Sequence, residues 1–473
     1  MGKEIGSAGF TADDFARFSQ RLQLETTHAQ AAYARGEFAD EGLVAGFELE
    51  AWLINEHFFP VPLNVPFLER MDSPLVVPEL SMFNVEINGT PQDLGGTALS
   101  QLESELTATW QQCRRVAADL GVSVIAIGTL PTLRERDLSL ASMSPFKRYA
   151  ALNEQVLRLR GGRPLALDIA GIDNLSLTHA DVMLEAATTS FQVHLQTPVS
   201  EVARTYNASQ ILSAPLVALA ANSPFLFGRA LWHETRIPLF EQTVACCEPG
   251  HSEHARVTFG SGYLAGDPTA LFAENLSAYP VLLPFEEPGP VHAYAHLRLH
   301  NGTIWRWNRM LIGFDRDAVP HLRIEQRVMP AGPSIVDMIA NAAFFYGAVR
   351  ILARQSVAPE SRLPFAGACD NFYRAARCGL EAQLVWVDGR RDNVAELLLR
   401  ELLPMAHEGL IELGLAAADI ERYLAVICAR LHSRQNGAAW QLAHYAKYQD
   451  FFRLAADYLE HQRRLMPVHE WPI

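Results

Sequence analysis

The 473-residue sequence has few cysteines, no run of positive charge and no long uninterrupted apolar segment. Its six cysteines form no CxxC pair and no regular framework, which indicates a reducing compartment. We interpret the adjacent Cys246 and Cys247 as buried thiols and not as a redox pair. The net charge of −14, from 39 Lys and Arg against 53 Asp and Glu, argues against nucleic acid or an anionic membrane as the main partner. An enzyme of this charge that acts on anions would need local positive charge or metal ions.

The sequence also offers no convincing membrane span or secretory signal. The longest charge-free stretch, residues 205–228, contains Pro215, Asn222 and Pro224, so we predict a buried helix that leads into a loop. The opening MGKEIGSAGF lacks an apolar signal core and does not match the myristoylation pattern. We therefore expect a cytoplasmic protein without a membrane partner.

Apolar spacing predicts an α+β protein whose last third is helical. A hairpin is expected in HLRLHNGTIWRWN, with its turn at Asn301 and Gly302. We expect one domain over residues 1–473, in which a helical part (336–473) packs on a sheet-containing core (1–335). The expected helices are 10–36, 99–120, 146–161, 334–355, 393–413, 417–433 and 436–464, and the expected strands are 43–54, 122–131 and a further group between 188 and 330.

Four expected strands carry unusual polar side chains on one face, because alternate residues of a strand share a face. For any one of these strands alone, an ordinary solvent-facing surface explains the polar face. Ordinary exposed faces are rich in Lys, Thr and Ser, however, whereas these carry Glu, His, Gln, Asn and Arg, which are ligand types. The polar sets are Glu48, Glu50 and Trp52 in FELEAWL, Asn84, Glu86 and Asn88 in FNVEIN, Gln192, His194 and Gln196 in FQVHLQ, and Arg323, Glu325 and Arg327 in LRIEQRV.

If the four faces join, several glutamates meet in one hollow, and their repulsion would raise their pKa values unless cations lie among them. Mg²⁺ meets this need with oxygen ligands and leaves part of its shell to water or nucleotide phosphate. The pattern therefore predicts that Glu48 and Glu50 bind metal. Glu79 stands seven residues before Glu86 and needs a bend or a separate strand to join the site, and Pro78 and Ser81 are consistent with such a break.

Other motifs give weaker signals. His292, His296 and His300 have a spacing of four, but on a strand they would lie roughly 13 Å apart, too far to share one zinc ion. We expect them on a polar hairpin face. The sequence has no GxxxxGK[ST] phosphate loop, nucleophile elbow or HExxH, so covalent catalysis and the common ATPase folds lack support.

The strand motifs resemble, in order, those of glutamate–cysteine ligase family 2, which includes the plant-type enzymes and bacterial carboxylate–amine ligases. GFELEAWLI is similar to the family's G-x-E-x-E strand, PELSMFNVEINGTP to its P-E-L and I-E-I-N segment, and SFQVHLQ to its Q-V-H strand. ANSPFLFGR resembles its A-N-S-P-F loop, with Arg236 following as in the family, and Arg148-Tyr149 resembles its R-Y pair. HNGTIWRWNRM and LRIEQRVMPAG resemble the final pair of strands, so the blocks extend from about 46 to 335.

The resemblance implies a glutamine-synthetase-like fold, in which a curved antiparallel sheet forms an active-site funnel. It implies ATP, Mg²⁺ or Mn²⁺, and a ligation in which ATP activates the γ-carboxylate of glutamate as an acyl phosphate before an amine displaces phosphate. Arg236 and Arg327 would neutralise phosphate or hold the substrate carboxylate; for Arg327, the alternative is a salt bridge on the sheet to Glu325 or another acid. The implied metal ligands are Glu48, Glu50, Glu79, Glu86, His194 and Glu325; the catalytic candidates are Glu50, Arg236 and Arg327; and Arg148, Asn222 and Arg309 are further candidates for substrate or ATP binding.

Two alternatives stay open. The protein could be a ligase of this fold with another carboxylate and amine, because residues 166–194 match no amine-binding pattern. It could also be a catalytically silent partner that binds nucleotide or an amino acid and docks through its helical last third. Small molecules are the expected partners, with no nucleic acid, and the sequence does not fix the oligomeric state.

Overall fold

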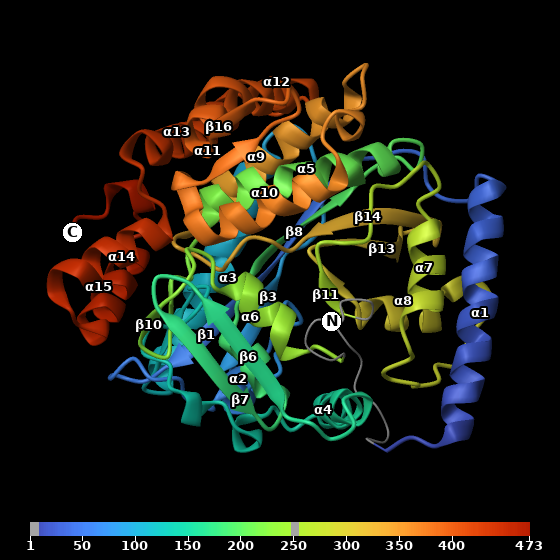
Figure 1. Cartoon of the computed structure of the whole chain (residues 1–473), viewed down its shortest axis with the longest axis horizontal. Helices are drawn as coiled ribbons and strands as arrows, with labels where there is room; N and C mark the ends of the chain where they lie inside the picture. Colours follow the sequence, from blue (N-terminus) through green and yellow to red (C-terminus); the bar gives the residue numbers. More distant parts are fainter. Residues whose placement is uncertain (1–8, 247–254) are drawn as a thin grey trace.

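The computed structural model describes residues 9–246 and 255–473 (Figure 1). Cys247 lies outside this part of the chain, whereas Cys246 is half-buried and its Sγ lies 3.6 Å from the carbonyl oxygen of Val244. The main sheet is antiparallel throughout and has the strand order β13-β14-β8-β1-β3-β2, with β4 and β5 also paired to β1. Its strands are β1 (Val44–Ile54), β2 (Val76–Pro78), β3 (Asn84–Asn88), β4 (Gln92–Asp93), β5 (Ser123–Ile125), β8 (Phe191–Gln196), β13 (Asn308–Phe314) and β14 (Pro320–Gln326).

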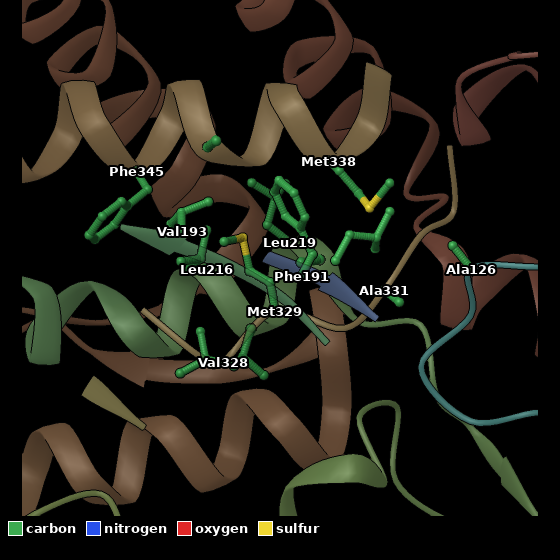
Figure 2. Packing of buried hydrophobic residues seen from close by; sticks show 14 of the residues in the cluster. Ala126, Phe191, Val193, Leu216, Leu219, Val328, Met329, Ala331, Met338 and Phe345 are labelled. Atoms are coloured by element: carbon green, nitrogen blue, oxygen red, sulfur yellow. The ribbon is translucent and has the colours of Figure 1, made fainter. Parts of the chain in front are cut away.

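The apolar side of this sheet is covered by helices, chiefly α9 (Ile335–Arg354) and α5 (Val202–Ala220). Figure 2 shows Phe191 and Val193 of β8 in one cluster with Leu216 of α5 and Met338 of α9. Every one of these side chains is at most 1% exposed. The strict alternation of the strands therefore sends apolar side chains to the helices and leaves the polar set on the opposite face.

The remaining elements surround this sheet. They are α1 (Ala12–Ala34), α2 (Asn64–Met71), α3 (Ala98–Asp119), α4 (Lys147–Leu159), α6 (Arg236–Thr243), α7 (Ala270–Ala278), α8 (Ala295–Gly302), α10 (Phe365–Cys378), α11 (Val394–Leu397), α12 (Leu403–Glu412), α13 (Ala417–Ser433), α14 (Gly437–Tyr448) and α15 (Phe451–Arg463). Short strand pairs are β6 (Leu165–Ala170) with β7 (Asn174–His179), β9 (Phe225–Leu226) with β10 (Arg229–Ala230), β11 (Val257–Thr258) with β12 (Trp305–Arg306), and β15 (Gln383–Val385) with β16 (Arg391–Asn393).

Two helices of the last third, α12 and α13, pack against α9, whereas α14 and α15 pack against each other to one side (Figure 1). α12 approaches α9 at two glycines: a Cβ on Gly409 would lie 1.9 Å from the carbonyl oxygen of Gly347. α13 is tied to α9 by the fully buried pair of Arg430 and Asp337, 2.7 Å apart. Backbone contact and a buried ion pair thus join the last third to the sheet-covering helix.

The expected hairpin at Asn301 and Gly302 is wrong, because this segment forms α8. The spacing of HAYAHLRLH fits a helix as well as a strand, and tertiary contacts decide between them. Glu25 of α1 accepts hydrogen bonds from the ring of His296 (2.8 Å) and from the backbone NH of Leu297 (2.9 Å), which satisfies the start of the helix. The hairpin of this region is instead β13 with β14, joined by residues 315–319.

Other expectations on the elements hold in varying degree. α5 is almost wholly buried, as predicted for residues 205–220. The expected strand at 122–131 is reduced to β5, and the expected helix at 436–464 divides at Gln449, which has a φ of 53°. α10 was not expected. α9 is long and apolar enough to cross a membrane, but 83% of its most apolar 18-residue window is buried inside the protein, as in a core helix.

Candidate active site

The strand register brings the four polar faces together. On β1, Glu50 lies opposite Glu86 of β3 and Glu48 lies opposite Gln192 of β8. His194 of β8 in turn lies opposite Glu325 of β14. Residues from four strands that are far apart in sequence therefore share one side of the sheet, and they form two groups.

The first group consists of Glu48, His194 and Glu325, whose ligand atoms lie within 4.8 Å of one another. His194 Nε2 is 3.3 Å from Glu48 Oε1 and 3.9 Å from Glu325 Oε1. Burial opposes ionisation of Glu48, but attraction by His194 outweighs it and lowers the pKa of this carboxyl. The other carboxylate oxygen of Glu48 is buried and accepts no hydrogen bond from the described residues. An unsatisfied oxygen beside an imidazole nitrogen is suited to a divalent cation.

Arginines already hold one member of this group. Arg309 binds both oxygens of Glu325, at 2.7 and 3.0 Å, and Arg327 Nη1 binds one of them at 2.9 Å. Burial would raise the pKa of Glu325, but these two guanidinium groups keep it well below its usual value. Arg323 Nε lies 3.2 Å from His194 Nδ1. Positive charge thus compensates much of the first group.

The second group consists of Glu50, Glu79 and Glu86, again with ligand atoms within 4.8 Å of one another. Burial and repulsion by Glu86 raise the pKa of Glu50 to about 7, against the attraction of Arg327. Burial, Glu86 and Glu50 raise the pKa of Glu79 well above its usual value. Three carboxylates this close repel one another and offer the all-oxygen ligand set that Mg²⁺ prefers. The second group therefore fits Mg²⁺ better than the first.

Local structure fixes these side chains. Glu50 accepts hydrogen bonds from the backbone NH of Ser190 (2.7 Å) and from Gln192 Nε2 (3.1 Å). Glu79 directly follows β2, a separate strand paired with β3, and Ser81 then forms an isolated bridge with Met143. Arg148 Nη2 and the Tyr149 hydroxyl donate to the carbonyl oxygen of Pro78, at 3.3 and 2.9 Å. Arg148 therefore supports the segment that carries Glu79.

Two further arginines lie beside the groups. Arg327 forms the ion pair with Glu325 that the sequence left as an alternative, and its Nη1 also donates to Gln192. Arg236 begins α6 and donates from Nε to Glu234 (3.1 Å) and from Nη2 to the carbonyl oxygen of Arg327 (3.2 Å). Burial lowers the pKa of Arg236, and attraction by Glu234 and then by Glu50 offsets this only partly. Arg236 thus links α6 to β14 at this site.

The structure does not place Asn222 as a site ligand. Its side chain is fully buried, and its amide nitrogen donates to the carbonyl oxygen of Ala331 (2.7 Å) and to the hydroxyl of Tyr458 (2.8 Å). Its amide oxygen accepts from Gln441 at 2.8 Å. All of these polar atoms are taken by the protein, so Asn222 joins the loop after α5 to the last helices and has nothing left for a ligand.

Sequence reasoning missed one acidic residue of this site. Glu185 lies in a short 3-10 helix, Val182–Ala187, just before β8. Burial and repulsion by Glu50 raise the pKa of its carboxyl to about 8, against the attraction of Arg327, so it faces the same polar region. A single carboxylate within the apolar run VMLEAA was the available signal. His292, His296 and His300 belong to neither of the two groups found among the described residues.

Comparisons with known proteins agree with this geometry. A protein provisionally named glutamate–cysteine ligase 2, from Trichormus variabilis, is 24% identical over 380 residues, which cover 78% of this chain and 81% of that protein. The crystal structure of a glutamate–cysteine ligase from Francisella tularensis in complex with AMP has a TM-score of 0.59 at 11% identity and covers 90% of this chain and 89% of its own. A bifunctional glutathione synthetase from Pasteurella multocida has a TM-score of 0.50 at 12% identity and covers 93% of this chain and 55% of its own.

The structural likenesses show the fold, and they confirm the expected α+β, glutamine-synthetase-like architecture with its antiparallel sheet and helical last third. The model of the family described as Glutamate-cysteine ligase family 2 matches residues 45–450. That range contains both carboxylate groups and their arginines. The chain therefore belongs to glutamate–cysteine ligase family 2 and is a ligase.

Proposed function

We propose that this ligase is ATP- and Mg²⁺-dependent and joins the γ-carboxylate of glutamate to an amine through an acyl phosphate. One observation carries the proposal: two groups of three side chains of types that can bind a metal ion lie on one polar sheet face. Arg327 donates a hydrogen bond to Glu325 of the first group, and its charge acts on Glu50 of the second. Family membership supports carboxylate–amine ligation, and the AMP in the Francisella neighbour supports a nucleotide substrate.

The metal ligands follow from the two groups. In this proposal Glu50, Glu79 and Glu86 hold one Mg²⁺ or Mn²⁺, and Glu48, His194 and Glu325 hold a second. Bound there, the cations would neutralise the carboxylates and polarise phosphate oxygens of ATP. Both oxygens of Glu325 accept hydrogen bonds from Arg309. The second cation, bound by Glu325, would therefore displace part of that contact.

The residues of the chain would position the substrates and neutralise the charge that develops on phosphate. In the first step a carboxylate oxygen of glutamate attacks the γ-phosphorus of ATP, and the bond to ADP breaks. In the second step the amine attacks the acyl carbon, the bond from that carbon to the phosphate oxygen breaks, and inorganic phosphate leaves with the electron pair and takes up the proton that the amine loses. Arg327 is suited to the charge that develops on phosphate, since its buried Nε has no hydrogen-bond partner among the described residues. Arg236 would hold Arg327 in place through its backbone carbonyl.

Positioning of this kind needs no protein nucleophile, which agrees with the absence of nucleophile motifs in the sequence. Arg309 would act by orienting Glu325, and Arg148 by holding the segment of Glu79. Glu185 faces Glu50 and Arg327 and is our candidate for contact with a substrate. We place the activity in the cytoplasm, in agreement with a sequence whose six cysteines form no CxxC pair.

Incubation with ATP, Mg²⁺ and glutamate, followed by measurement of ADP over a panel of amines, tests the proposal. The panel should include cysteine, other amino acids and short peptides, and aspartate and α-ketoglutarate serve as alternative carboxylates. ADP release that requires both a carboxylate and an amine is the expected result. Calorimetric binding of ATP and Mg²⁺ without turnover for any pair would instead support a catalytically silent binding partner.

A further inference from the structure

A surface pocket lies where the end of α3, strand β5 and the end of α15 meet, among residues that the metal-ligating groups do not include. Its volume is about 470 Å³. Three arginines line it: Arg114 and Arg115 from α3, and Arg463 from the last turn of α15. Gln111 and Ser123 add polar groups. The residues that line this pocket include no Asp or Glu.

The three guanidinium groups lack the ion pairs that arginines of this protein usually form. In the part of the chain that the structure describes, no carboxylate lies within 4.0 Å of Arg114, Arg115 or Arg463, whereas the neighbouring Arg464 pairs with Glu460 at 2.9 Å. This is notable in a protein of net charge −14. Burial and then repulsion by Arg463 lower the pKa of Arg114, and Glu460 offsets this only partly. The cluster therefore keeps an uncompensated positive charge.

The arrangement is fixed by contacts between the three elements. Arg463 Nη2 donates to the hydroxyl of Ser123 at 2.9 Å, and Arg114 Nη1 donates to the carbonyl oxygen of Arg463 at 3.5 Å. The helix dipole favours a basic residue at the end of α15, which accounts for Arg463. It does not account for Arg114 and Arg115, since neither lies in the last turn of α3. Their convergence with Arg463 needs another reason.

We propose that this pocket binds a small organic or inorganic anion with at least two negative charges, of the phosphate or carboxylate class. Guanidinium groups bind both classes through paired hydrogen bonds. The volume lies within the range of small-ligand sites, about 300–1,000 Å³. Val122 and Val124 supply an apolar wall beside the arginines. The site does not depend on the ligase activity proposed above.

Calorimetry with citrate and with inorganic pyrophosphate tests the site, in a buffer without Mg²⁺ or nucleotide and with about 150 mM NaCl to screen weak surface attraction. The variant Arg115→Gln/Arg463→Gln removes two exposed guanidinium groups, and Arg464→Gln is the matched control, because Arg464 is adjacent in sequence but paired with Glu460. Melting curves without ligand establish that both proteins fold; if the double variant does not, Arg463→Gln alone replaces it.

Wild-type protein should bind at least one probe, and the double variant should bind it at least tenfold more weakly, about 1.4 kcal/mol. The control should stay within about twofold of wild type. Preference for citrate or pyrophosphate identifies the carboxylate or the phosphate class. The proposal is overturned if neither probe binds at about 10 mM, if the double variant binds like wild type, or if the control loses as much affinity as the double variant.

Discussion

Glu50 of β1 lies directly opposite Glu86 of β3 in the antiparallel sheet. Side chains at such positions have Cβ atoms about 4.5–5.5 Å apart, and like charges there destabilise a sheet. Burial and this repulsion raise the pKa of Glu50 to about 7. The pair costs the sheet stability, and this cost is consistent with the cation that we propose at Glu50 and Glu86.

Glu50→Gln should abolish most Mg²⁺-dependent turnover and leave the fold intact. The substitution removes one carboxylate from the repelling group, while a glutamine oxygen can still accept from the NH of Ser190. We expect turnover to fall by about 10²-fold or more, with a melting temperature equal to or above that of wild type. ADP release and thermal melting, each with and without Mg²⁺, measure the two effects.

Glu56→Gln is the control for this experiment, because the Glu56 side chain is 84% exposed just after the same strand. It should leave both turnover and melting unchanged. In wild type, Mg²⁺ should raise the melting temperature, and in Glu50→Gln this increase should shrink. A large loss of stability in Glu50→Gln would show that Glu50 is structural.

The contact between Arg309 and Glu325 gives a second prediction. Arg309→Met should lower the free energy of unfolding by about 3–5 kcal/mol, because it leaves a buried carboxylate with only part of its compensation. Arg309→Met/Glu325→Gln should cost less than the sum of the two single substitutions. Urea unfolding of the four proteins measures the coupling, and additive effects would argue against a buried ion pair.

Strand alternation is a local property, and for this reason the polar faces were visible in the sequence. Glu48, Glu50, Glu86 and Glu325 come to one side of the sheet as the period of two predicts. Their division into two groups depends on cross-strand register, which no single segment encodes. That these residues bind metal stays a prediction.

A buried acid outside the two candidate metal-binding groups leads to a prediction about pH. Burial raises the pKa of Glu241 from 4.5 to about 7, although Trp307 Nε1 and the Tyr373 hydroxyl both donate to it. The folded protein therefore binds this proton more tightly than the unfolded chain. The resulting stability is fully present below about pH 4.5 and is lost as the pH rises through about 7.

Glu241→Gln should accordingly match wild type at pH 5 and be more stable at pH 8, by up to about 3 kcal/mol. The amide keeps an oxygen for both donors. Urea midpoints at the two pH values test this, with Glu56→Gln as the exposed comparison. Equal midpoints of variant and wild type at pH 8 would contradict the raised pKa.

The close approach of α9 and α12 gives a further prediction. Gly409→Ala should destabilise the protein by about 1–3 kcal/mol or more, because the added methyl group meets the backbone oxygen of Gly347, which cannot rotate away. Gly262→Ala is the control, since a Cβ there would have no neighbour within 4 Å. Thermal melting compares the two, and similar shifts would show that helix contact is not the cause.

The sequence could not show features that depend on contacts between residues distant from each other in the chain. The sequence of α8 predicts a strand, because the helix depends on Glu25 of α1, a distant residue that binds its first turn. Asn222 resembles a ligand in its motif, yet Tyr458 and Gln441, more than 200 residues later, bind its amide group. Glu185 has no polar neighbours in its own segment, and its importance comes from Glu50 and Arg327.

The hydroxyl of Tyr346, on α9, donates to the backbone oxygens of Gly46 and His194, at 3.2 and 3.1 Å. The Tyr346 side chain thus holds β1 and β8 together on the side of the sheet that faces away from the carboxylates. Since α12 and α13 contact α9 at Gly347 and Asp337, the last third of the chain holds α9 in position and thereby supports these two strands. Truncating it would loosen the spacing between carboxylates that it never touches.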